Sequence, residues 1–207
     1  MRNVAILGAA LAAVAASALC VSGASALPIK QGGTFRMAIS VGVFQSIDPA
    51  LYGLESRILR PACAALMSYP DKPLPAGLRL TPELAKSYPI VSRDRRTYTF
   101  TIRRDARFSD GSPVTARVFV HALERMFDPQ MKSGAGPFFG DILGAREMLA
   151  GSATTLAGAT ATGRTLRLRL TRPVPDLVAR TSGLCAVPSG LPADPEGAKA
   201  PLPSPGP

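Results

Sequence analysis

Residues 93–129 read RDRRTYTFTIRRDARFSDGSPVTARVFVHALERMFDP, and they carry the clearest structural pattern in the chain. Apolar and polar side chains alternate over residues 97–103, which predicts a half-buried strand. Asp110 and Gly111 then predict a tight turn, because glycine adopts the positive φ that such turns often need. An apolar stripe with helical spacing over residues 116–127 predicts an amphipathic helix. Strand, turn and helix in this order indicate a mixed α/β unit.

Similar patterns predict further elements. They are a strand over 34–39, a helix from about residue 60 to 67, a short helix beginning at Thr81 and Pro82, a loop over 134–140, a helix over 142–150, a strand over 164–170 and a short helix over 176–183. The segment 164–170 carries Arg164, Arg167 and Arg169 among leucines at 166, 168 and 170, a pattern that predicts a strand with leucines inside and arginines outside. These arginines could bind anions, but a solvated sheet face is the favoured interpretation.

An export signal is predicted at the start of the chain. Residues 1–26 combine a short basic start, an apolar run over 4–19 and an A-x-A cleavage motif at 24–26. We therefore expect the mature chain to begin at Leu27. An uncleaved membrane anchor and a lipoprotein modified at Cys20 are the two alternatives.

The composition fits a folded, basic, loop-rich protein. Of the 207 residues, 46% are hydrophobic and 18% are charged, which is typical of a globular chain rather than a disordered one. The 20 prolines and 19 glycines indicate many turns. The formal net charge of +10 suits an anionic cell surface, although a generic basic surface is the simpler interpretation. Nucleic acid is not an expected partner of an exported chain.

Two cysteines, Cys63 and Cys185, remain after the predicted cleavage. An exported compartment permits a disulfide, which would contribute roughly 4–5 kcal/mol in the chain-entropy treatment. Two buried free thiols are the alternative. The sequence contains no C-x-x-C motif or Cys/His cluster, so neither a metal site nor a cofactor is expected.

Several short motifs follow one another along the chain. They are GGTFR at residues 32–36, IDPA at 47–50, PELAKS at 82–87, YTFTIR at 98–103, FSDGSPVTA at 108–116 and LTRP at 170–173. Their order, behind an export signal, resembles the extracellular solute-binding proteins of family 5, which serve peptide and nickel ABC transporters. The resemblance covers nearly all of the mature chain but less than half of a family member.

This resemblance implies a mixed α/β fold in which two lobes close on a ligand, as in type II periplasmic binding proteins. The chain would supply a mixed-sheet, partial lobe I. The expected organisation is a signal peptide over 1–26, a partial solute-binding lobe I over 27–187, and a proline-rich, truncated tail over 188–207.

The function implied by the resemblance is the substrate-binding component of an ABC importer for peptides or similar solutes. The ligand-binding residues implied are Tyr52, Gly53 and Leu54, because this stretch aligns with a loop that faces ligand in family members. The expected partners are a small peptide or related solute and a membrane permease. We expect a monomer that is exported to the periplasm or the outer face of the cytoplasmic membrane.

Two rival functions remain open. One is an exported basic module that binds a permease or an anionic cell surface without capturing a solute. The other is an exported hydrolase, which the residue content disfavours because His121 is the only histidine and no nucleophile–base set is evident. We expect His121 to serve in packing, and we expect no catalytic residues.

Overall fold

The computed structural model describes residues 48–51, 62–134 and 136–194. The chain divides into two units, 1–40 and 41–207, and every described residue belongs to the second unit. The export signal and the strand predicted over 34–39 therefore lie outside the described residues.

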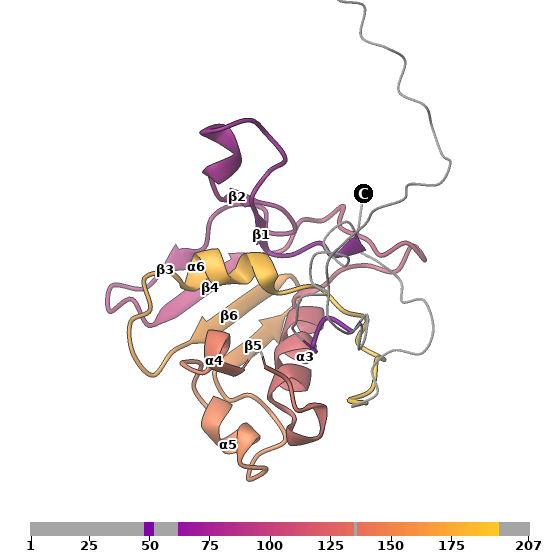
Figure 1. Ribbon diagram of the computed structural model, residues 1–207, viewed down its shortest axis with the longest axis vertical. Helices are drawn as coiled ribbons and strands as arrows, with labels where there is room; N and C mark the ends of the chain where they lie inside the picture. Colours follow the sequence, from indigo (N-terminus) through magenta and orange to yellow (C-terminus); the bar gives the residue numbers. More distant parts are fainter. Residues whose placement is uncertain (1–47, 52–61, 135, 195–207) are drawn as a thin grey trace, which may run out of the picture. The chain divides into compact units, whose positions relative to one another are not determined.

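The centre of the unit is a four-stranded antiparallel sheet with the strand order β3-β4-β6-β5 (Figure 1). The strands are β3 (Ile90–Val91), β4 (Thr97–Thr101), β5 (Ala159–Thr162) and β6 (Thr165–Arg169). β4 and β6 confirm the two strands predicted over 97–103 and 164–170. Their register places Tyr98 opposite Leu168 and Phe100 opposite Leu166, so the apolar side chains of both strands share one side.

The helix α3 (Ala116–Phe127) has the bounds predicted from its apolar stripe and packs against β5 and β6. The apolar side of the sheet and the apolar stripe of α3 supply much of the hydrophobic core. The largest fully buried side chains of the sheet and α3 are Phe100, Phe119, Leu123, Met126, Phe127, Leu166 and Leu168. After α3, the Asp128 carboxylate accepts a hydrogen bond from Gln130 N and begins a short 3₁₀ turn (Pro129–Met131).

A second, two-stranded sheet corrects two of the predicted helices. It consists of β1 (Met67–Ser68) and β2 (Thr81–Pro82), and it replaces both the helix predicted up to residue 67 and the helix predicted from Thr81. The backbone oxygen of Leu66 accepts hydrogen bonds from Glu83 N and Ala85 N, and Thr81 Oγ1 donates to Ser68 O rather than capping a helix. Long-range pairing therefore overrides the local helical spacing.

Short helices and 3₁₀ turns complete the described residues. A 3₁₀ turn (Ala76–Leu78) lies between β1 and β2. The helices are α4 (Gly136–Phe139), α5 (Ala145–Leu149) and α6 (Leu177–Arg180), with another 3₁₀ turn (Thr181–Gly183) after α6. α5, α6 and the turn after α6 confirm the helices predicted over 142–150 and 176–183, although α5 is shorter than predicted. α4 occupies the predicted loop over 134–140, so that prediction was wrong. Within the described ranges, no helix is long and apolar enough to cross a membrane.

Candidate functional site

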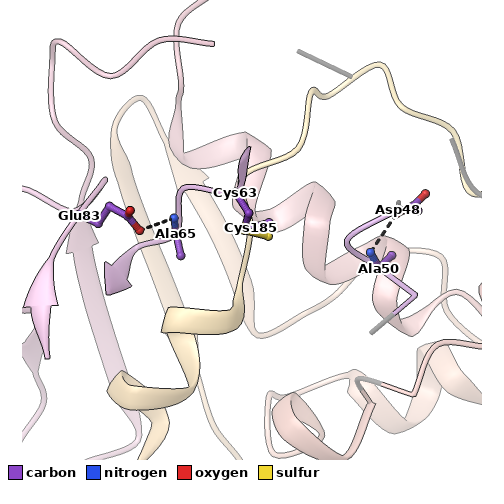
Figure 2. The surroundings of a disulfide bond; sticks show 6 residues. All are labelled: Asp48, Ala50, Cys63, Ala65, Glu83 and Cys185. Carbon is purple, nitrogen blue, oxygen red and sulfur yellow. Dashed lines mark hydrogen bonds between the residues drawn. A yellow bond between two sulfur atoms is a disulfide. The ribbon is translucent and has the colours of Figure 1, made fainter. Parts of the chain in front are cut away.

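The turn at residues 48–51 directly precedes the predicted ligand-binding residues and is fixed by its own hydrogen bonds. Asp48 Oδ1 accepts from Ala50 N at 2.9 Å (Figure 2). Leu51 N donates to Asp48 O at 3.0 Å. Ser133 Oγ donates to Ala50 O from the loop that follows the 3₁₀ turn. Such a local network is typical of an Asp-Pro turn, in which the Asp side chain bonds to the backbone two residues on.

A buried ion pair attaches this turn to α3. Arg125 Nη1 donates to Asp48 Oδ1 at 2.9 Å, and Arg125 Nη2 donates to Asp48 Oδ2 at 2.5 Å. The side chains of Asp48 and Arg125 are only 0% and 2% exposed. This two-point geometry is the strongest form of a side-chain ion pair, and it fixes orientation as well as distance.

The same turns of α3 also hold the chain near the C-terminal end of the described residues. Arg125 Nε donates to Pro192 O at 3.0 Å. His121 Nε2 lies 2.8 Å from Leu191 O, and it must carry the proton because a carbonyl oxygen only accepts. His121 and Arg125 therefore anchor residues 191–192, while Arg125 also anchors the turn at 48–51. These contacts give His121 a structural role.

A disulfide fixes the other end of the segment that contains the predicted ligand residues. Cys63 and Cys185 are bonded, with their Cα atoms 5.3 Å apart, which decides between the two alternatives left open by the sequence. Ala65 N donates to Glu83 Oε2 at 2.8 Å (Figure 2). Ala186 N donates to Ala64 O. Residues 52–61 thus connect two fixed points. One is the turn at 48–51, which the ion pair attaches to α3, and the other is the disulfide at Cys63.

The predicted site residues Tyr52, Gly53 and Leu54 lie outside the described residues, and so do Cys20 and the cleavage motif. Sequence reasoning missed the role of Asp48 and Arg125. A signal for it was present, because Arg125 falls within the otherwise apolar stripe of α3. A lone arginine on a buried helix face needs a carboxylate, and an Asp-Pro turn offers one.

The lowered pKa values in this unit belong to exposed, local pairs. The Ser92 hydroxyl lowers the pKa of Asp94, Arg103 lowers that of Asp105, Ser112 lowers that of Asp110, and Arg180 lowers that of Asp176. Each hydrogen-bond partner lies within four residues of its aspartate. These groups stabilise turns and surface pairs, and they do not form a shared site. The part of the chain that the structure describes holds no group of three His, Cys, Asp or Glu residues that could bind a metal ion.

Comparison with known proteins identifies one family. Residues 79–205, more than half of the chain, match the bacterial extracellular solute-binding proteins, family 5 middle. The chain is 33% identical over 149 residues to the periplasmic murein peptide-binding protein MppA of Escherichia coli, a match that covers 69% of this chain and 26% of MppA. It is 35% identical over 137 residues to the periplasmic oligopeptide-binding protein OppA of Escherichia coli, covering 63% and 24%.

A solved structure shares the fold. The complex of Haemophilus influenzae OppA with RPPGFSPFR matches with a TM-score of 0.63 and 29% identity, over 70% of this chain and 28% of that one. The predicted class, a mixed α/β partial lobe of a type II periplasmic binding protein, is therefore confirmed. The chain spans about a quarter of the length of the curated relatives it matches.

Proposed function

Because the chain belongs to the bacterial extracellular solute-binding proteins of family 5, we propose that it acts within the substrate-binding component of an ABC importer for peptides or similar solutes. The match over residues 79–205, together with the shared fold, is the observation that carries this proposal. The names of MppA and OppA describe periplasmic peptide-binding proteins, which supports a peptide as the solute. The family is one of solute-binding proteins, and this chain accordingly performs no catalysis.

The chain contributes part of the ligand site rather than all of it, since it spans about a quarter of MppA and OppA. Within the organisation of signal peptide, partial lobe I over 27–187 and tail over 188–207, the ligand contacts are assigned to Tyr52, Gly53 and Leu54. Two features support this assignment. The turn at 48–51 is anchored to α3, and the disulfide at Cys63 holds the chain beyond residue 61.

The remaining assignments follow from the family and from the names of the relatives. The chain is exported to the periplasm or to the outer face of the cytoplasmic membrane. The names of MppA and OppA describe them as periplasmic, which supports this location. It works as a monomer with a membrane permease, and nucleic acid is not a partner.

The test is a titration of isotope-labelled residues 27–207 with di- and tripeptides, followed by NMR. We expect weak, saturable binding, with a dissociation constant of about 1 mM or weaker, because a partial lobe supplies few of the contacts. The largest amide shifts should fall at residues 52–54. Substitution Tyr52→Ala should remove them, whereas the control Tyr69→Ala, at an exposed position in a described loop, should not. Shifts that are absent, or that do not depend on residue 52, would overturn the assignment.

A further inference from the structure

The outward side of the sheet carries exposed cations whose role the solute-binding function does not explain. On β4 and β6, the residues that alternate with the buried core residues are threonines and arginines. We call this side, over Thr97–Thr101 and Thr165–Arg169, the arginine–threonine face. Arg167 and Arg169 are exposed on this face. Leu166 and Leu168, which alternate with them along β6, are fully buried on the opposite side of the sheet. The prediction of leucines inside and arginines outside is therefore confirmed for β6, whereas Arg164 lies in the turn before the strand.

The register places at least one threonine opposite each arginine. Arg167 lies opposite Thr99 on β4 and opposite Thr160 on β5, and Arg169 lies opposite Thr97. A row of three threonines from β4, β6 and β5 completes the face. No carboxylate stands opposite either arginine on these strands. The hydroxyls and guanidinium groups together form a dense set of hydrogen-bond donors.

The charges on this face are not neutralised within the described residues. Arg103, Arg125, Arg172 and Arg180 each form a close ion pair. Arg167 and Arg169 form no ion pair there and are exposed; the same holds for Arg164, which lies in the turn between β5 and β6 rather than on the face. Arginines without a carboxylate keep their full affinity for phosphate oxygens, which they bind in a fork geometry.

The turn between β3 and β4 extends the basic surface at one end of the sheet. Arg93, Arg95 and Arg96 are exposed there, and Leu170 N donates to Arg96 O, so the turn lies beside the end of β6. The one acid in this turn, Asp94, already accepts hydrogen bonds from Ser92 Oγ and Arg96 N. The excess of positive charge therefore continues beyond the sheet.

One apolar side chain stands out on the same side. Ile90 of β3 lies opposite Thr99 and is 77% exposed. Cationic and hydroxyl donors spread over adjacent strands suit an extended surface of many phosphates, and an exposed isoleucine beside them suits an apolar layer just below the phosphates. A nucleic acid fits less well, because the outward positions of β4, β5 and β6 offer no aromatic ring on which bases could stack.

We propose that the arginine–threonine face binds the phosphate headgroups of an anionic phospholipid bilayer. The arginines bind phosphate oxygens, the threonine hydroxyls donate to neighbouring headgroup oxygens, and Ile90 enters the boundary of the acyl region. The formal net charge of +10 draws the chain toward such a surface. Binding holds the chain beside the membrane and is reversible, because it rests on exposed charges that salt screens.

The test is vesicle co-sedimentation of the full chain. The vesicles contain equal parts of phosphatidylglycerol and phosphatidylcholine, or phosphatidylcholine alone. Binding to the neutral vesicles measures the contribution of the apolar run at residues 4–19, which is subtracted. The remaining binding should fall about tenfold or more in the double variant Arg167→Glu/Arg169→Glu. It should fall similarly in wild type at about 0.5 M salt, because the Debye length is then well below 10 Å.

A matched control carries the same change in net charge. Lys72→Glu/Arg79→Glu alters two exposed cations in the loop between β1 and β2, away from the sheet face. This control and the charge-conserving Arg167→Lys/Arg169→Lys should keep most of the binding, with unfolding temperatures equal to wild type. An equal loss in the loop variant would mean that net charge alone is responsible and would overturn the proposal. Tighter binding to duplex DNA than to vesicles, at matched phosphate concentration, would overturn the choice of a bilayer.

Discussion

Arg125 on α3 forms a buried, two-point ion pair with Asp48, which lies 77 residues earlier in the chain. Neither side chain is more than 2% exposed, so both charges have lost their water and depend on each other. The guanidinium also donates to Pro192 O. One side chain thus joins α3 to the segment that leads into residues 52–54 and to the last described segment of the chain.

Replacement of Arg125 by methionine should destabilise the fold by about 3–5 kcal/mol, because it leaves the Asp48 carboxylate buried without its cation. Chemical unfolding in urea measures the change. The control is Arg117→Met on the same helix, where the side chain is largely exposed and lies 3.7 Å from Glu124. We expect the control to cost about 1 kcal/mol or less.

The pair should also behave as a unit. The double variant Asp48→Asn/Arg125→Met should lose less stability than the two single variants added together, because it leaves no buried charge without a partner. Additive losses would contradict this account of the ion pair.

Removal of the disulfide in Cys63→Ala/Cys185→Ala should lower the free energy of unfolding by about 4–5 kcal/mol in the chain-entropy treatment, since 122 residues separate the two cysteines. Urea unfolding with and without reductant provides the measurement. Reductant should shift wild type toward the variant and leave the variant unchanged. A variant as stable as oxidised wild type would show that the bond does not constrain the unfolded chain.

Substitution of Phe100 measures how much the core between β4 and β6 contributes to the free energy of unfolding. Phe100 is fully buried opposite Leu166, and Phe100→Ala should cost about 3–5 kcal/mol through lost burial and the cavity left behind. The neighbouring Thr99 points to the other side of the strand, and Thr99→Ala should change stability by about 0.5 kcal/mol or less. Similar losses for the two variants would mean that the inward and outward sides are wrongly assigned.

The sequence predicts β4, β6 and α3 well because each has a full set of residues with one periodicity and one buried side. The helix predicted up to residue 67 does not form, because the same apolar side chains are buried equally well when the segment is extended. Pairing of Leu66 with the chain at 83–85, and the bond between Cys63 and Cys185, decide the outcome there. β3 has only two residues, too few for a periodic pattern.

The same contrast holds for the candidate site. Family motifs point to residues 52–54, but what fixes the chain on either side of them comes from partners far away in sequence. Asp48 needs Arg125, and Cys63 needs Cys185, across 77 and 122 residues. The sequence indicates that a buried Arg125 needs a carboxylate and that two cysteines are available, but local propensity does not identify which groups meet; the tertiary structure does.

Acid should weaken the fold through Asp105 and Asp176, whose pKa values are lowered from 3.8 by hydrogen bonds from Arg103 and Arg180. Because the folded pKa lies below the unfolded value, the native state favours the ionised form. The resulting stability is fully present above the unfolded pKa and is lost as the pH falls through the folded pKa. We therefore expect the urea midpoint of wild type to fall as the pH drops from about 5 toward 2.

The double variant Asp105→Asn/Asp176→Asn should be slightly less stable than wild type near pH 7 and should lose less stability on acidification, because its amides do not titrate. The effect should be small and should shrink in high salt, since both aspartates are exposed. Parallel curves for wild type and variant across this range would show that the two surface pairs contribute nothing to the pH dependence of folding.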